Sequence, residues 1–581
     1  MRGSLLVFLG GIVLLFVLLL VLLQPKPADR TQKQSPSQGE SDSVDHSSAR
    51  IESGAAMPSD NRTTAGPSSA DATSPAAEVR TDPAVGAVSA SSAEAAKDRS
   101  AEVIDRPAFP GWPTPALALV VTGEMRGYFE PCGCTANQLG GMSRRGDLFR
   151  QMTELGWKVR GVDIGSLARR TVRQAQIKLE TTLAAMRELG YAAVALGPEE
   201  LRLDPGYLIS QHMVDGDRPL YFLSANLVFF GTPDLGTPQA YTIIEQNGLR
   251  LGITSVMSES QRNTVLGESS GAASASADVT WTDPVAALSR VLEQFEQQGV
   301  HRRILLSQGT VEESRRLAER FPSFDLIVTA MGFGEGSRTP EMIGSVRLLQ
   351  VGEKGKHAGV VGFYADDAES PIRFELVTLS GAQFGESASM TRLMSAYQER
   401  LRDERIAVSE KPVVHPSGAA FIGVEKCGEC HTKAYEKWQS TAHAHAFDSL
   451  DPVHRRTGFE RLHGVARRYD PECLSCHVTG WDPQEFLRFD SGFVSPEFAE
   501  SDQQKQRAAW LTGNQCENCH GPGSRHVELV EAGDSDAAGR EMRVTLQQAR
   551  DSLCVSCHDG DNSPEFQFEK YWQEVEHSGK D

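Results

Sequence analysis

Cysteine is almost absent from this 581-residue sequence outside four short motifs. Of its ten cysteines, eight lie in pentapeptides of the pattern Cys-x-x-Cys-His, and the N-terminal half has no comparable motif. The four pentapeptides are CGECH (427–431), CLSCH (473–477), CENCH (516–520) and CVSCH (554–558). The chemistry that needs these thiols is therefore confined to one C-terminal segment.

Net positive charge is also lacking. Lys and Arg total 58 against 77 Asp and Glu, which gives a formal net charge of -19. Nucleic acid and anionic lipid headgroups carry charge of the same sign and would repel such a chain. The composition therefore argues against nucleic acid as a partner.

Charged residues are missing altogether from the run SLLVFLGGIVLLFVLLLVLL (4–23). A helix needs about 20 apolar residues to cross the hydrocarbon core of a bilayer. The QPKPADR that follows offers no convincing small-x-small cleavage site, and a removed signal peptide is the alternative. We predict an uncleaved transmembrane helix within residues 1–24, which anchors the chain in the inner (cytoplasmic) membrane by a single pass.

Residues 25–111 contain few aromatic side chains and are rich in Ser, Ala, Pro, Asp and Glu, as in SASSAEAAKDRSAE. A segment of this composition cannot bury enough apolar surface to offset the entropy lost on ordering. We therefore predict a disordered linker between the membrane helix and the folded part of the chain.

The Cys-x-x-Cys-His pattern is typical of covalent attachment of haem c. The two thiols form thioethers to the porphyrin, and the histidine is a ligand of the iron. Zinc sites also use paired Cys-x-x-Cys units, but they do not require a histidine after every second cysteine. Disulfides are a third alternative, although a two-residue spacing makes small strained loops and leaves the repeated histidine unexplained.

We predict four covalently bound haem c groups. The attachment residues are Cys427, Cys430, Cys473, Cys476, Cys516, Cys519, Cys554 and Cys557, and the proximal iron ligands are His431, His477, His520 and His558. Covalent haem attachment takes place outside the cytoplasmic membrane, so the bulk of the chain is expected to face the periplasm.

Strand-like and helix-like segments alternate between residues 112 and 385. ALALVVTG, KVRGVDIGS and YAAVALG have the character of buried strands, and AQIKLETTLAAMRELG has helical spacing and ends on Gly190. Alternation of this kind predicts an α/β layered domain with a central sheet.

The order and the amino-acid sequences of these segments resemble those of the metallophosphoesterase domain of the secreted 5′-nucleotidase family. In that family an Asp-x-His metal pair follows the first strand, Gly-Asp the second and Gly-Asn-His-Glu the third, and a Ser-His pair and a Gly-His-x-His motif come later. The Gly-His-x-His motif is absent from the corresponding TAMGFGEG of this chain. The ligand positions are occupied here by Glu124, Arg126, Ser166, Pro198, Glu199 and Gln308. Two-metal hydrolysis depends on carboxylate and imidazole ligands. We therefore expect a catalytically inactive scaffold or docking module, with surviving hydrolysis as the alternative.

Cys132 and Cys134 are the two cysteines outside the haem motifs, in EPCGCTANQLGGMSRRG (130–146). They follow the first predicted strand, at the end of the sheet where α/β proteins usually bind ligands. A thiolate metal site, a redox-active pair, a contact to a haem edge and two idle or mutually bonded thiols all stay open.

The sequence around the four motifs resembles that of a known cytochrome family. The phrases FIGVEKCGECHTKAYEKWQSTAHAHAF, CLSCHVTGW, CENCHGPGSRHV and CVSCHDGDNSPEFQFEKYWQEVEH occur in the order found in the tetrahaem cytochromes similar to cytochrome c five-fifty-four of ammonia oxidisers. By this resemblance the distal ligands are His443, His526 and His577, and His445 competes with His443. The remaining haem either uses His463 or is five-coordinate, as one haem is in that family.

The predicted fold class is multidomain. After the transmembrane helix and linker come an α/β layered metallophosphoesterase-like domain (112–385), a connecting helix (386–417) and a mainly helical, loop-rich multihaem cytochrome c domain (418–581). The predicted function is electron transfer between redox partner proteins of the periplasm or membrane, with an inactive phosphoesterase-like domain as scaffold. The alternative is a multihaem oxidoreductase that acts on a small nitrogen or sulfur compound at an open haem face.

Overall fold

The computed structural model describes residues 109–131, 138–212, 216–267, 278–332, 334–364, 367, 369–452 and 464–577. All of these residues fall within a single unit, Ala87–Asp581. The predicted linker is almost entirely outside the described residues, and so are Cys132, Cys134 and His463.

The prediction of a transmembrane helix, and with it a single-pass anchor in the inner membrane, is corrected by the structure. Across the described ranges, no helix has both the length and the apolarity needed to cross a membrane. The longest helix there, α4 (Arg173–Leu189), has 17 residues and carries both acidic and basic side chains. A spanning helix needs about 20 predominantly apolar residues. Residues 4–23, for which the helix was predicted, lie outside the described residues.

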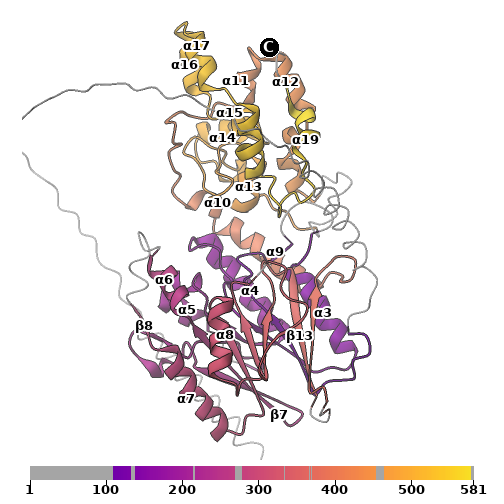
Figure 1. Ribbon diagram of the computed structural model, residues 1–581. Coiled ribbons are helices and arrows are strands. Elements are labelled where there is room, and N and C mark those ends of the chain that lie inside the picture. Colours follow the sequence, from indigo (N-terminus) through magenta and orange to yellow (C-terminus); the bar gives the residue numbers. More distant parts are fainter. Residues whose placement is uncertain are drawn as a thin grey trace, which may run out of the picture. The chain divides into compact units, whose positions relative to one another are not determined.

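Two six-stranded sheets form the α/β region, as Figure 1 shows in part. The first sheet has four parallel strands, with β13 and β14 added antiparallel at one edge. Leu119 of β1 lies opposite Arg160 of β2 on one side and Val361 of β13 on the other. In spatial order its strands are β14 (Ile372–Thr378), β13 (His357–Phe363), β1 (Leu117–Thr122), β2 (Val159–Asp163), β3 (Tyr191–Ala195) and β4 (Tyr221–Leu223).

The second sheet also has a parallel centre and antiparallel edges. Its spatial order is β11 (Glu341–Ile343), β12 (Val346–Gln350), β10 (Leu326–Thr329), β9 (Arg302–Gln308), β7 (Leu249–Met257) and β6 (Tyr241–Gln246). Strands β5 (Leu227–Phe229) and β8 (Val279–Trp281) form a separate two-stranded ribbon.

Alternating side chains of the central strands are buried on both faces of the sheet. In β1, Leu117, Leu119 and Val121 pack with side chains of the second sheet, whereas Ala118 and Val120 pack beneath helices. This period of two follows from the pleat of a strand. Parallel sheets covered on both faces give continuous apolar runs of the kind seen in ALALVV. The predicted α/β layered region is therefore confirmed.

Helices cover the outer faces of both sheets. Helices α3 and α4 contact the first sheet, and α7 and α8 contact the second. Helix α9 packs on α3 and α4. The helices of this part are α3 (Met142–Glu154), α4, α5 (Pro205–Gln211), α6 (Glu259–Gly267), α7 (Pro284–Gln297), α8 (Val311–Arg320), α9 (Ala388–Asp403) and α10 (Ile406–Ser409).

The C-terminal region is built from short helices and loops, as predicted. Its side-chain core is small and contains Trp481, Phe489 and Phe493, while α12 and α16 contain no buried residue. The helices are α11 (Val424–Gly428), α12 (Thr432–Gln439), α13 (Pro471–His477), α14 (Asp502–Trp510), α15 (Cys516–His520), α16 (Ser524–Glu531), α17 (Ser535–Glu541), α18 (Leu546–Gln548) and α19 (Phe568–Val575), with shorter turns at η4 (His443–His445), η5 (Phe447–Leu450) and η9 (Cys554–Ser556).

A buried carboxylate holds the loop that follows β2. Glu200 is fully buried, and its two oxygens accept hydrogen bonds from the backbone N–H groups of Ser166, Leu167, Ala168 and Gly197. The donor–acceptor distances are 2.8 to 2.9 Å. Backbone donors in a buried loop need such partners, because an unsatisfied donor loses its hydration without compensation.

We expect Glu200→Ala to destabilise this loop. Removing the carboxylate leaves buried N–H groups unpaired, which should cost about 3 kcal/mol of local stability. Hydrogen–deuterium exchange of the Ser166–Ala168 amides in the full chain should accelerate accordingly. Glu319→Ala, at an exposed position of α8, is the matched control and should leave the exchange unchanged. Equal exchange in both variants would contradict the role of Glu200.

Candidate functional site

Each Cys-x-x-Cys-His motif folds into about one turn of helix. The second motif ends α13 and the third spans α15, whereas the first begins in α11 and the fourth in η9. The His431 N–H donates to the Cys427 carbonyl at 2.9 Å, and the His558 N–H donates to that of Cys554 at 2.8 Å. Residues three and four apart share one side of such a turn. Both thiols and the imidazole of a motif therefore face the same side.

Contacts between thiols bring the motifs together in pairs. The thiols of Cys427 and Cys516 interact and helices α11 and α15 contact each other, so the first motif lies beside the third. The thiols of Cys476 and Cys557 also interact, so the second motif lies beside the fourth. Segments far apart in the sequence thus place their attachment residues next to each other.

Imidazole rings face one another in three pairs. The ring centres are 6.2 Å apart for His431 and His526, 6.0 Å for His443 and His558, and 5.9 Å for His520 and His577. A metal–imidazole bond is about 2 Å long, so two imidazoles on opposite faces of one iron have ring centres about 6 Å apart. The three pairs fit the geometry expected for a haem iron with two histidine ligands.

Hydrogen bonds fix the orientation of several of these rings. Nδ1 lies 2.7 Å from the Ala446 carbonyl in His477, 2.6 Å from that of Met542 in His520, 3.0 Å from that of Ala538 in His526 and 3.0 Å from that of Val575 in His577. A carbonyl oxygen can only accept, so Nδ1 carries the proton in these four rings. The lone pair is then on Nε2, which is the arrangement that a metal-binding histidine needs.

Burial keeps the central imidazoles neutral. It lowers the pKa of His443 to about 4, and it lowers the pKa of His520 and His558 as well. Neutral imidazole is the form that binds metal. His445, which competed with His443 in the sequence, is half exposed and lies 3.6 Å from the Asp448 carboxylate. The geometry therefore favours His443 over His445 as the partner of His558.

The replaced ligand positions of the phosphoesterase-like sheet converge at the ends of its strands. The Glu124 N–H donates to the Gly165 carbonyl and the Arg126 N–H to that of Ser166, each at 2.8 Å. The Gln308 side-chain amide donates to the Ile164 carbonyl. Glu124, Arg126 and Ser166 have φ of 49°, 47° and 56°, in the left-handed region that non-glycine residues rarely adopt. Strained backbone of this kind is typical of present or former functional sites.

An arginine occupies the centre of these loops. The Arg126 guanidinium pairs with Glu124 at 3.0 Å and with Glu353 at 3.4 Å. Burial raises the pKa of Glu124, although Arg126 acts in the opposite direction. Nowhere in the described part of the chain are three or more His, Cys, Asp or Glu side chains grouped so that they could hold a metal ion.

The N-terminus of α13, which carries the second motif, is held by residues that the sequence did not point to. Lys178 of α4 pairs with Glu472 at 2.6 Å, and Gln174 of α4 donates to the same carboxylate at 3.0 Å. Asp470 caps α13 and accepts from Gln398 of α9 at 2.9 Å. Burial lowers the pKa of Lys178, but the carboxylates of Glu472 and Asp470 outweigh it and raise that pKa overall.

A second set of contacts involves the residue three positions after His558. The Asp561 carboxylate accepts from Lys356 at 2.8 Å, from the Tyr128 hydroxyl at 3.1 Å, and from Lys354. Burial raises the pKa of Asp561, but the hydrogen bonds from the two lysines outweigh it and lower that pKa overall. Tyr128 belongs to the loop after β1, so this strand-end loop contacts the fourth motif.

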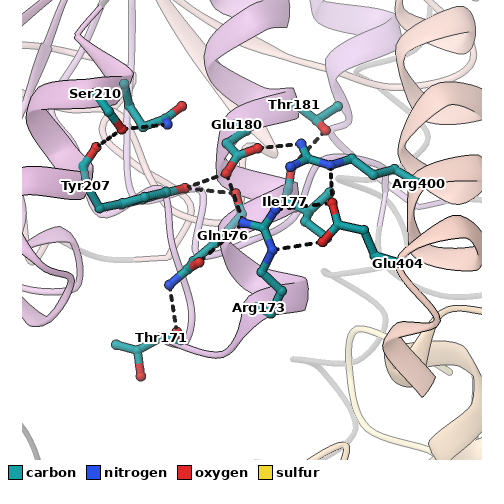
Figure 2. A network of polar contacts seen from close by, with 11 residues as sticks. Thr171, Arg173, Gln176, Ile177, Glu180, Thr181, Tyr207, Ser210, Arg400 and Glu404 are labelled. Carbon is teal, nitrogen blue, oxygen red and sulfur yellow. Dashed lines mark hydrogen bonds and ion pairs between the residues drawn. The ribbon is translucent and has the colours of Figure 1, made fainter. Parts of the chain in front are cut away.

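An ionic network joins α4 to α9 (Figure 2). Arg173 of α4 pairs with Glu404 at 2.9 Å and with Glu180 at 3.2 Å, and Arg400 of α9 pairs with Glu404 at 2.6 Å and with Glu180. The Tyr207 hydroxyl also contacts the Glu180 carboxylate at 3.1 Å. The network fixes together the two helices that hold the N-terminus of α13.

Residues 426–521 match the family Cytochrome c554 and c-prime. The chain is also 33% identical over 151 residues to cytochrome c-554 of Nitrosomonas europaea. That alignment covers 24% of this chain and 58% of the relative, so the chain spans little more than half of the relative's length. The resemblance of the C-terminal region to this cytochrome family is confirmed.

Solved structures similar to part of the chain include a 5′-nucleotidase precursor and a sulfate thiohydrolase. A 5′-nucleotidase precursor from Thermus thermophilus is 22% identical, with a TM-score of 0.41, over 51% of this chain and 60% of its own. The sulfate thiohydrolase SoxB from the same organism is 15% identical, with a TM-score of 0.43, over 51% of this chain and 62% of its own.

We expect His443→Ala and His445→Ala to differ in their effect on the haem spectrum. Loss of His443 removes the ring that faces His558, so one low-spin haem should become high-spin and bind carbon monoxide when reduced. His445→Ala is the matched control two residues away and should leave the spin state unchanged. Electron paramagnetic resonance of the oxidised protein measures this, and a high-spin signal in the control instead would assign the ligand to His445.

Proposed function

We propose that this protein is a c-type cytochrome that transfers electrons through four covalently bound haem c groups between redox partner proteins. The observation that carries the proposal is the pairing of three imidazole couples with ring centres 5.9 to 6.2 Å apart, each including one histidine of a Cys-x-x-Cys-His motif. The match of residues 426–521 to a cytochrome family supports it. Two histidine ligands saturate an iron and suit it to electron transfer rather than to substrate binding.

The residues of the chain supply attachment, ligation and orientation. Haem c, when bound, supplies the iron that takes up and releases one electron. The cysteines of each motif would hold the porphyrin, and the two facing imidazoles would bind the iron from either side. Hydrogen bonds from Nδ1 to backbone carbonyls keep the rings of His477, His520, His526 and His577 from rotating. Fixed ligands limit the rearrangement that accompanies a change of oxidation state.

The proximity of the motifs supports electron transfer within the chain. The first motif lies beside the third, and the second lies beside the fourth, because their thiols are in contact. Haems attached to adjacent thiols would lie close to one another. Electrons could then pass between haems over short distances before they reach a partner protein.

The α/β region serves in this proposal as a catalytically inactive scaffold and docking module. Arg126 places a positive charge between Glu124 and Glu353, at the strand ends where the family binds its metals. A fixed guanidinium opposes the binding of divalent cations by electrostatic repulsion. The loops keep their shape through backbone hydrogen bonds and through Glu200, without any need for a metal.

We expect the full chain, matured in a host that makes c-type cytochromes, to carry four haems. Haem staining should survive denaturing electrophoresis, and the mass should exceed that of the polypeptide by four haem groups, because thioethers resist denaturation. Replacing Cys554 and Cys557 together by Ser should remove one haem mass. Loss of all stain on denaturation would exclude covalent attachment, and an unchanged mass in the double variant would exclude the fourth motif.

We expect the purified chain to hydrolyse neither nucleotides nor sugar nucleotides, with or without added manganese or zinc. The reason is the loss of metal ligands at Glu124, Arg126, Ser166, Pro198, Glu199 and Gln308. Phosphate release measures this directly. Metal-dependent turnover that Glu353→Gln abolishes would contradict the proposal, because it would place an active site among these loops.

A further inference from the structure

Two of the four motifs are flanked by carboxylates that lysines of the α/β region hold. Glu472 directly precedes Cys473 of the second motif and pairs with Lys178 at 2.6 Å. Asp561 follows His558 of the fourth motif by three residues and pairs with Lys354 and Lys356. The second and fourth motifs also lie beside each other. The α/β region thus places three cations against one pair of haem motifs.

Each of these ion pairs has one largely buried partner, whereas Glu472, Lys354 and Lys356 are 28%, 25% and 33% exposed. The side chains of Lys178 and Asp561 are 10% and 11% exposed. Charges in such surroundings act over longer distances than charges on the surface, because less water and salt lies between them. A nearby positive charge favours the reduced form of an iron centre, and a nearby negative charge favours the oxidised form. Each partner of an ion pair therefore acts on a neighbouring haem in the opposite sense.

We propose that Lys178, Lys354 and Lys356 are positioning residues that set the reduction potentials of the haems on the second and fourth motifs. Lys178 acts through its ion pair with Glu472, and Lys354 and Lys356 act through their ion pairs with Asp561. The inference rests on the proposed function and deepens it. It assigns the inactive phosphoesterase-like region a role in electron transfer, because its loops and helix α4 determine which haems are the better electron acceptors.

The geometry supports a fixed rather than an adaptable contact. Lys178 extends from α4, which Arg173 and Glu180 tie to α9 in the network of Figure 2. Lys354 has a left-handed backbone with φ of 58°, and its N–H donates to the Glu124 carbonyl at 2.8 Å. Both cations therefore belong to parts of the α/β region that are held by their own hydrogen bonds and ion pairs.

The test is a spectroelectrochemical titration of the full-length holoprotein, which follows the one-electron reduction of each haem. Lys354→Met combined with Lys356→Met should lower one reduction potential, whereas Asp561→Asn should raise the same one. Lys178→Met should lower another, and Glu472→Gln should raise it. Nuclear magnetic resonance signals assigned with the His443→Ala protein identify the haem of the fourth motif.

Opposite shifts are the decisive result, because they separate a charge effect from a structural one. If the substitutions only loosened the contact, the lysine variant and the carboxylate variant of one ion pair would shift the reduction potential in the same direction, because the haem would become more exposed to water. Arg315→Met, which breaks an ion pair with Glu341 elsewhere in the α/β region, is the control and should move no potential. Shifts of equal sign, no shift, or a uniform shift of all haems would overturn the proposal.

Failure of this inference is distinguishable from failure of the proposed function. If the protein carries four haems but the potentials do not respond to these substitutions, the electron-transfer proposal stands and the role of the lysines is wrong. If the protein carries no covalent haem, the proposed function is wrong, and so is the inference that rests on it.

Discussion

Facing imidazoles, 5.9 to 6.2 Å apart, set the constraint on which the C-terminal region depends. Each pair joins segments that are distant in the sequence, such as His443 with His558, so each pair closes a long loop. The side-chain core of this region is small, and helices α12 and α16 bury no residue of their own. A region with so little apolar core needs other links to hold its segments together. Iron bound by paired histidines would provide them.

The α/β region is held together by the burial of its two sheets and by hydrogen bonds within the loops at the strand ends. Its sheets are buried on both faces by alternating apolar side chains, and this burial does not depend on the strand ends. The loops at those ends keep left-handed conformations because Glu200 and Gln308 bind their backbone groups. These hydrogen bonds keep the loops ordered, and the outer residues of the loops contact another part of the chain.

That other part is the pair of motifs that Lys178, Lys354 and Lys356 contact. Helices α4 and α9 hold the N-terminus of α13 through Lys178, Gln174 and Gln398, and the ionic network of Figure 2 ties the two helices together. The strand-end loops of the α/β region and helix α4 thus contact the acidic residues beside the motifs. Lys178 is buried and Lys354 and Lys356 are partly buried, and each of the three lies beside a carboxylate that it pairs with.

The sequence by itself determined the four Cys-x-x-Cys-His motifs and the alternation of strands and helices, because each depends on residues close together in the chain. The turn from Cys427 to His431 is local, and so is the alternating burial of β1. Hydropathy measures only the apolarity of a run, and the predicted membrane helix is corrected by the finding that no helix of the described residues is long and apolar enough to cross a bilayer; residues 4–23 lie outside them. The placement of His443 rather than His445 opposite His558 and the contact of Lys354 with Asp561 are set by tertiary structure alone. The sequence contains several histidines and many lysines that local sequence does not distinguish. Only long-range packing brings His443 to face His558 and Lys354 to pair with Asp561.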